Sequence, residues 1–290
     1  MTVSRLKWGS DLMRLGALTI DDINGGNTHI DGGAMFGVVP KPLWTRKYKV
    51  NDKNQVHTPT HPILIQHPDY NILIDAGIGN NKLTDKQKRN SGVTQESFIK
   101  EELAYFGLTP DDIDMVLMTH LHFDHAAGLT NEHGHALFKN ATHYIQQDEW
   151  HEFLAPNIRS QATYWKENQG DYEEKVILFK DNIEPVPGIR MIHTGGHSNG
   201  HCIITIESEG QKAVHMADIF PTLAHRNPLW VTAYDDYPMT SIEEKERCIP
   251  YYIFNDYWFL FYHDEEYFAL KFDLDKHNVK ETVKRAYRLY

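Results

Sequence analysis

Several features that define other protein classes are missing from this sequence. Only two cysteines, Cys202 and Cys248, occur in 290 residues, which is too few for a disulfide framework, and Cys202 is expected in the core as a reduced thiol. No apolar run approaches the roughly 18–20 residues of a membrane span, and charged residues interrupt the first twenty positions, so no signal-peptide core is visible. We therefore expect a cytoplasmic protein with no membrane partner.

Basic clusters and flexible linkers are also lacking. The formal net charge is −11 at pH 7, so the chain would repel a phosphate backbone, and no nucleic acid is expected as a partner. No stretch rich in Pro, Gly or Ser divides the sequence, which favours a single domain over residues 1–290. The hydrophobic content of 41% is ample for a sizeable core.

Short apolar runs predict strands, and these strands outnumber the predicted helices. Helices are expected at 95–108, after a capping box formed by Ser241 and Glu244, and over the last residues, 277–290. Segment 147–175 is rich in aromatic and polar residues and is interpreted as a helical lid or insertion. The order of the elements indicates an α/β fold. The predicted strands lie at 62–66, 71–77, 115–118, 142–146, 188–194, 201–207, 212–218, 257–264 and 266–272.

The chain contains 18 histidines, and three of them fall in the segment THLHFDHAAG, directly after a predicted strand. On an extended backbone, residues two apart point the same way, so His120 and His122 can converge on one ion. Asp124 and His125 lie past the turn and can reach a second ion nearby. Neutral imidazoles and carboxylates suit zinc, iron, manganese or cobalt better than magnesium or calcium.

Three further residues can complete two metal sites. His197 lies in the Gly-rich loop HTGGHSNGH, where small residues allow the backbone to approach an ion closely. Asp218 and His263 each lie at the end of an apolar run. A lone His or Asp at a strand end is ordinary, but together these residues supply the ligands that the first motif lacks.

These motifs, taken in order, resemble those of the metallo-β-lactamase-fold hydrolase superfamily. The stretch ILIDAGIG is similar to the early Asp motif of that superfamily, here at Asp75, and segments 31–44 and 85–97 resemble the YtnP-type lactonases and the methyl parathion hydrolases. The resemblance implies an αββα sandwich in which helices flank two central mixed β-sheets. It also suggests a homodimer.

The resemblance further implies a role for each residue in these motifs. Two divalent ions, most simply zinc, would be bound. Asp218 would bridge them, and Asp124 and Asp218 would be the catalytic carboxylates, with Asp218 passing a proton to the leaving alkoxide. Asp75 and His201 would form hydrogen bonds around the ligands. The first ion would be held by His120, His122 and His197, and the second by Asp124, His125 and His263.

The reaction that the resemblance implies is attack of a hydroxide shared by two metal ions on a lactone carbonyl. N-acyl-homoserine lactones are the expected substrates, with quorum quenching as the consequence. Pro221 stands where better-known lactonases carry a Tyr. Phosphotriester hydrolysis, an iron-dependent persulfide dioxygenase and a metal-stabilised binding module stay open as alternatives. An apolar substrate wall is expected from Phe36, Trp44, Phe123 and Phe220.

Overall fold

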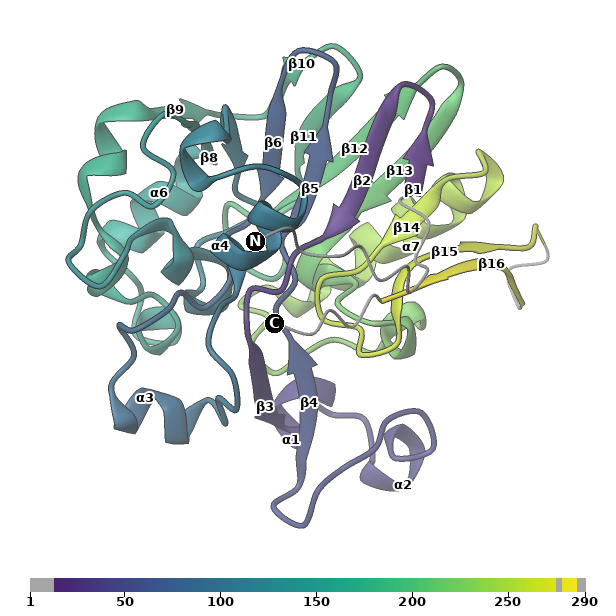
Figure 1. The fold of residues 1–290 in the computed structure, drawn as a ribbon. Coiled ribbons are helices and arrows are strands. Elements are labelled where there is room, and N and C mark those ends of the chain that lie inside the picture. The colour runs from purple at the N-terminus through teal and green to yellow at the C-terminus, as the bar shows by residue number, and fades with distance from the viewer. Residues whose placement is uncertain (1–12, 275–277, 286–290) are drawn as a thin grey trace.

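Two mixed β-sheets of seven strands each form the centre of the molecule (Figure 1), as seen in a computed structural model that describes residues 13–274 and 278–285. The first sheet has the order β1 (Met13–Leu15), β2 (Leu18–Asp22), β5 (Ile63–Gln66), β6 (Asn71–Ile74), β7 (Met115–Leu117), β8 (Thr142–Gln146) and β9 (Val176–Phe179). The second has the order β10 (Asn182–Val186), β11 (Ile189–His193), β12 (Cys202–Ser208), β13 (Gln211–His215), β14 (Trp258–Leu260), β15 (Tyr267–Phe272) and β16 (Val279–Lys284).

Both faces of the central strands of each sheet are buried, which explains why these strands read as continuous apolar runs. In β5, Ile63 and Ile65 face the core between the sheets, whereas Leu64 points to the opposite face. The inner core joins residues of both sheets, and Cys202 lies in it as a free thiol. Strands β5 and β6 pair antiparallel, so the residues between them form a hairpin.

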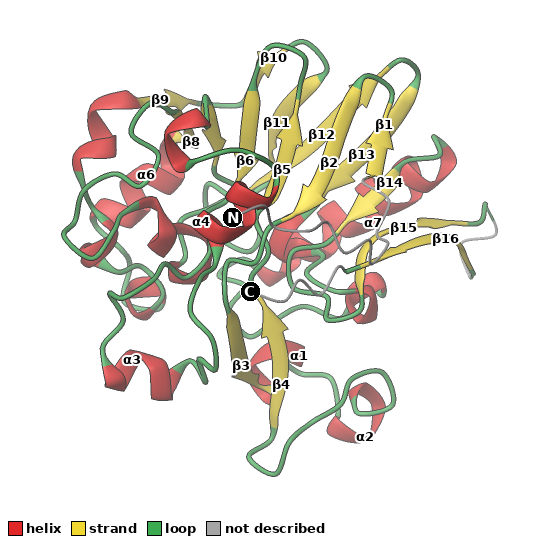
Figure 2. Ribbon diagram, in the orientation of Figure 1, coloured by secondary structure: helices red, strands yellow, loops and turns green. Residues whose placement is uncertain are grey.

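Helices cover the two outer faces (Figure 2). On the first sheet, α4 (Ile99–Tyr105) and α6 (Gln147–Leu154) contribute Ile99, Leu103 and Phe153 to a second core. On the second sheet, α7 (Pro238–Phe254) packs Ile249 and Ile253 into a third core. The layers therefore follow the order helix, sheet, sheet, helix, and the predicted αββα sandwich is confirmed.

An arm projects from one end of the sandwich (Figure 1). It consists of the two-stranded sheet of β3 (Asn27–Asp31) and β4 (Gln55–Pro59) with α1 (Gly32–Phe36) and α2 (Lys41–Trp44). Two short helices, α3 (Asp85–Asn90) and α5 (Phe123–Ala126), lie in loops after the first sheet's strands. Single 3₁₀ turns occur at Pro110–Asp112, Ala127–Leu129, Ser160–Ala162, Lys166–Asn168, Asp171–Lys175, Ala217–Ile219 and Leu223–Arg226.

One helix prediction is wrong, and another helix begins three residues earlier than predicted. The described part of 277–290 contains the strand β16, which pairs with β15, while residues 277 and 286–290 lie outside the described residues. The exposed face of this edge strand carries Lys and Glu, a composition that is also typical of surface helices. The helix expected to begin at Ser241 begins at Pro238, because proline is favoured in the first turn and Ser241 is buried within the helix.

Segment 147–175 is helical and contributes to the core of the fold. Its residues Phe153, Tyr164 and Tyr172 are buried in the second core. The assignment of the segment as a lid stays a prediction. None of the described helices is long and apolar enough to cross a lipid bilayer.

Candidate metal centre

The candidate ligands lie at one edge of the sandwich because parallel strands end there. Strands β6 and β7 run parallel in the first sheet, and β13 and β14 run parallel in the second. The loop after β7 carries His120, and those after β13 and β14 carry Asp218 and His263. Carboxyl ends of parallel strands share one edge of a sheet, so the fold itself gathers these side chains.

Three imidazoles form the first group, with His120 and His122 on one loop and His197 on another. All three are at most 4% exposed, and their candidate ligand atoms lie within 4.8 Å of one another. His197 Nε2 is 2.9 Å from His122 Nδ1. These are the residues expected to hold the first ion.

The second group consists of Asp124, His125 and His263. His125 Nε2 and His263 Nε2 are 3.2 Å apart, and Asp124 Oδ2 is 3.7 Å from His263 Nε2. The two imidazoles are buried, whereas Asp124 is half-buried. The ligands expected for the second ion therefore also lie together.

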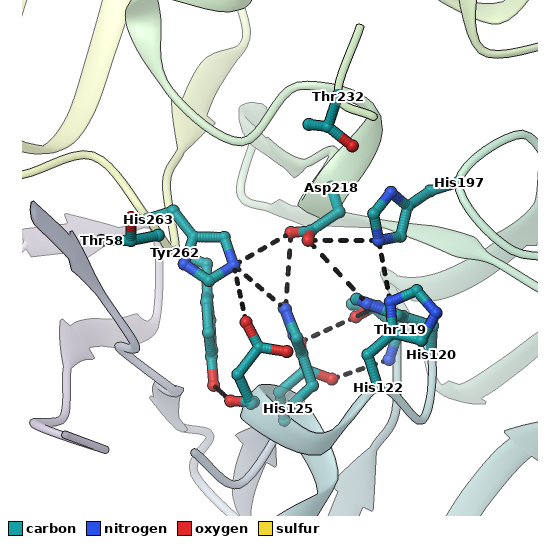
Figure 3. A network of polar contacts seen from close by, with 12 residues as sticks. Thr58, Thr119, His120, His122, His125, His197, Asp218, Thr232, Tyr262 and His263 are labelled. Atoms are coloured by element: carbon teal, nitrogen blue, oxygen red, sulfur yellow. Dashed lines mark hydrogen bonds and ion pairs between the residues drawn. The ribbon is translucent and has the colours of Figure 1, made fainter. Parts of the chain in front are cut away.

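Asp218 lies between the two groups (Figure 3). Its Oδ1 atom is 3.3 Å from His263 Nε2 and 3.4 Å from His125 Nε2. Its Oδ2 atom is 3.4 Å from His197 Nε2 and 3.9 Å from His120 Nε2. Each carboxylate oxygen thus faces a different group, as a bridging ligand requires.

The charge states of Asp218, His120 and His122 suit a cationic ligand. Although burial alone would raise it, the imidazoles of His263, His125 and His197 hold the pKa of Asp218 well below its usual range. Burial and neighbouring imidazoles lower the pKa values of His120 and His122, so these rings are neutral near pH 7. A neutral imidazole carries the lone pair that a metal ion binds.

Hydrogen bonds at the outer ring nitrogens direct that lone pair inward. His125 Nδ1 donates to Asp75 at 2.8 Å, His197 Nδ1 to Asp235 at 2.9 Å and His263 Nδ1 to the carbonyl of Pro59 at 2.8 Å. With Nδ1 engaged as a donor, Nε2 is the nitrogen of each ring that points at the centre and is left to bind a metal ion.

Unpartnered atoms indicate that these residues fit a cation. Among the described residues, His120 Nε2 and Asp218 Oδ1 are buried and make no hydrogen bond, which costs about 1–3 kcal/mol for each group. Two ligands at about 2.1 Å from a tetrahedral zinc ion are about 3.4 Å apart, close to the spacings around Asp218. The donor set therefore fits divalent metal ions, and zinc suits it well.

Asp75 and His201 both contact ligands, as expected. Asp75 accepts hydrogen bonds from the Thr119 amide and hydroxyl at 2.8 and 2.7 Å, besides that from His125. Its φ of 58° is uncommon for a residue other than glycine. His201 Nε2 accepts the Asp218 amide proton at 3.2 Å. His201 belongs to none of the candidate ligand groups found among the described residues.

Sequence reasoning missed three supporting residues. Asp235 accepts from both His197 and Thr232. Tyr262 donates to the Asp124 carbonyl at 2.7 Å and stacks on His125. Glu149, on α6, is 1% exposed. None of the three belongs to a recognisable pattern, and each acts through a contact that is distant in sequence.

Glu149 ties together the two loops that carry the first group. Its carboxylate accepts from the Leu121 amide at 2.7 Å, the Tyr164 hydroxyl at 2.8 Å and the Ser198 hydroxyl at 2.5 Å. Leu121 lies between two candidate ligands, and Ser198 follows a third, His197. Burial raises the pKa of Glu149.

Replacing Glu149 with leucine is expected to lower the free energy of unfolding by about 2–4 kcal/mol, because it leaves buried donors without an acceptor. Zinc affinity at the first group should also fall by about 10–100-fold. Denaturant titration and zinc competition measure the two effects. Glu149→Gln keeps one acceptor oxygen and is the milder control; equal stability of the leucine variant and the wild type would contradict this role.

A small cavity of about 80 Å³ opens onto the centre. Phe123 and Pro221 line it, but three of the four aromatic residues expected there do not. Phe36 and Trp44 stack on each other in the buried cluster of the arm, and Phe220 packs on Phe259 and Phe261 in the third core. The lining is mixed: Ile30, Met35, Thr58, Asn90, Ser91, His122, Phe123, Asp124, Thr163, His197, Asp218, Pro221, Thr232, Tyr234 and His263.

Comparisons with known proteins bear on this geometry. A family model described as the metallo-beta-lactamase superfamily matches residues 57–251. N-acyl homoserine lactonase AiiA from Bacillus thuringiensis subsp. kurstaki is 28% identical over 174 residues, which cover 55% of this chain and 62% of that protein. The chain thus spans about three fifths of the length of that curated relative.

Solved structures share the whole fold. A probable metal-dependent hydrolase from Staphylococcus aureus is 65% identical, with a TM-score of 0.94, covering 96% of this chain and 100% of the other. AidC, a dizinc quorum-quenching lactonase in complex with a product, has a TM-score of 0.76 at 16% identity, covering 96% and 98%. At that identity the likeness concerns the fold alone.

Proposed function

The chain belongs to the metallo-beta-lactamase superfamily, and from this premise we propose that it is a dinuclear metal-dependent hydrolase that opens lactone rings. N-acyl-homoserine lactones are the proposed substrates. The observation that carries the proposal is Asp218, whose two oxygens face two separate groups of ligands beside an open cavity. Lactonase activity in relatives that match this chain supports the choice of substrate.

Two bound divalent ions, with zinc proposed, would polarise the ring carbonyl and make a water nucleophilic near neutral pH. The protein's own residues orient the reaction. Asp124, which is half-buried, and Asp218 both line the cavity in which the ester bond would break. Asp218, on which both groups of ligands converge, is proposed to pass the proton of the attacking water to the departing alkoxide. Phe123, which stacks on Trp165, gives the cavity an apolar side.

The cavity size leads to an expected chain-length preference. Sites that enclose a drug-sized ligand measure about 300–1,000 Å³, whereas this cavity measures about 80 Å³. A lactone with a short acyl chain is closest to this size, whereas a long chain would have to displace residues that line the cavity. We expect kcat/KM to be at least about 10-fold higher for a butanoyl than for a dodecanoyl homoserine lactone, because displacing packed side chains costs about 1–3 kcal/mol.

A panel of lactones and aryl phosphotriesters, assayed on enzyme of measured metal content, tests the substrate class and the preference together. Met35→Ala enlarges the cavity and should narrow the chain-length difference, while Met239→Ala, at a residue 64% exposed, should not. Faster hydrolysis of phosphotriesters than of every lactone would reject the lactonase proposal. Oxygen uptake with a persulfide would instead support a dioxygenase.

Three finer points belong to the same proposal. The protein acts in quorum quenching, it is cytoplasmic, and it is a homodimer. Loss of lactone signal in a co-culture, cell fractionation and light scattering of the purified protein test them in turn.

A further inference from the structure

Arg285 follows β16, far from the metal-binding motifs in sequence, yet its side chain reaches the loop that carries His263. The residue is 7% exposed. Its Nη2 atom donates to the carbonyls of Phe261 and Tyr262 at 2.8 and 3.0 Å, and its Nε atom donates to the carbonyl of Asp264. One guanidinium therefore holds the peptides on both sides of His263.

The remaining contact of Arg285 continues the network to the first sheet. Its Nη1 atom donates to Asp22, at the end of β2, at 2.8 Å. The same Asp22 oxygen accepts from His61 Nδ1 at 2.9 Å. His61 follows Pro59 by two residues, and the Pro59 carbonyl accepts from His263 Nδ1 at 2.8 Å. Together with the chain between Pro59 and His61, these contacts form a closed ring that includes His263 and joins the ends of β2 and β16.

From this ring we propose that Arg285 is a positioning residue, which sets the place of His263 for the second metal ion. The inference rests on the proposed two-metal function. The 261–264 loop lies beyond the end of β14; the Phe261 amide still donates to the Phe268 carbonyl of β15 at 2.8 Å, but His263 itself lies outside the strands of the sheet. Only a planar guanidinium offers donors that can bind three carbonyls and a carboxylate at once.

The charge of Arg285 is compensated where it is buried. The Asp22 side chain is 3% exposed, and that of Arg285 is 2% exposed. A lysine at 285 would keep this charge pair but lose the planar set of donors. Its ammonium group cannot span the carbonyls on both sides of His263. Arg285→Lys thus separates positioning from charge balance.

The experiment measures zinc per chain and zinc affinity in the full-length protein. We expect the wild type to hold two ions and Arg285→Lys to keep the first, with affinity for the second lowered by about 10–100-fold. Lys284→Ala is the matched control: it lies next to Arg285, pairs with Glu266 at 2.8 Å and has a side chain that is 68% exposed. This control should bind zinc as the wild type does.

A double variant shows whether Arg285 acts through His263. In a His263→Ala background, where the second ion is already lost, Arg285→Lys should change zinc binding no further, since coupled residues are not additive. Asp22→Asn, which removes the charge facing Arg285, is a second variant in case the lysine variant does not fold. It is expected to weaken the second ion by a smaller factor.

The measured zinc content and affinities distinguish failure of the proposed function from failure of this inference. A wild type that binds fewer than two ions overturns the proposed function, and this inference with it. A wild type with two ions and a folded Arg285→Lys variant with unchanged affinity overturns the inference alone. Equal weakening of both ions, or further weakening in the His263→Ala background, would show that Arg285 supports the fold as a whole rather than His263.

Discussion

Replacing Asp218 with asparagine is expected to lower kcat/KM for lactone opening by about 10³-fold, on the order of the loss when a central electrostatic group is removed from an active site. The cause is geometric. Both carboxylate oxygens lie 3.3 to 3.9 Å from imidazole nitrogens, and an asparagine would turn an N–H₂ group toward one of the two groups. The variant keeps the volume of the side chain, so the fold should persist.

Metal content distinguishes this cause from a general loss of structure. Asp218→Asn is expected to hold one zinc ion per chain or fewer, with circular dichroism like that of the wild type. Asp256→Asn is the matched control, because Asp256 pairs with Lys271 at the surface, where ion pairs contribute little. An Asp218→Asn enzyme with full activity and two bound ions would rule out the bridging role.

The candidate ligands could be predicted because their chemistry limits them to a few residue types. His120, His122 and His125 are close in sequence, and His197, Asp218 and His263 each follow an apolar strand. Parallel strand ends meet at one edge, so a strand pattern is enough to expect convergence. The αββα layers could be predicted for a similar reason, since buried sheets read as short apolar runs.

The supporting residues could not be predicted in this way. Glu149, Asp235 and Arg285 are charged residues that belong to no motif and lie in segments of ordinary composition. What distinguishes them is burial against a partner far along the chain; Arg285 and Asp22 are 263 positions apart. Only the folded chain reveals such a pairing.

For the aromatic residues, the sequence predicted a role that the structure does not support. Phe36 and Trp44 lie in a segment that resembles lactonases, but their large apolar rings are buried against each other at a centroid distance of 4.9 Å. Packing within the arm accounts for the burial of both rings, and no substrate is needed to explain it. Position near a motif in sequence therefore does not identify a pocket wall, whereas Phe123, inside the motif, does line the cavity.

Removing metal with a chelator is expected to lower the melting temperature of the wild type by about 10 °C. At free zinc about 1,000-fold above Kd, binding contributes about 4 kcal/mol, and each kcal/mol shifts the melting temperature by about 2–4 °C in domains of about 150–250 residues. The physical source is the centre itself, where His120 Nε2 and Asp218 Oδ1 are buried without a hydrogen bond to any described residue. Because only the folded state binds the metal ion, the free energy of binding adds to the free energy of unfolding.

Measuring the change in melting temperature on chelation in two histidine variants shows which residues cause it. In His120→Ala the difference between zinc-loaded and chelated protein should shrink to a few degrees, because a fully buried ligand is lost. In His133→Ala, whose side chain is 73% exposed, the full difference should remain. Differential scanning calorimetry of the three proteins, each with and without chelator, measures this. A wild type that melts at the same temperature in both conditions would mean that these imidazoles are not stabilised by a cation, since an ion bound only by the folded state must raise its stability.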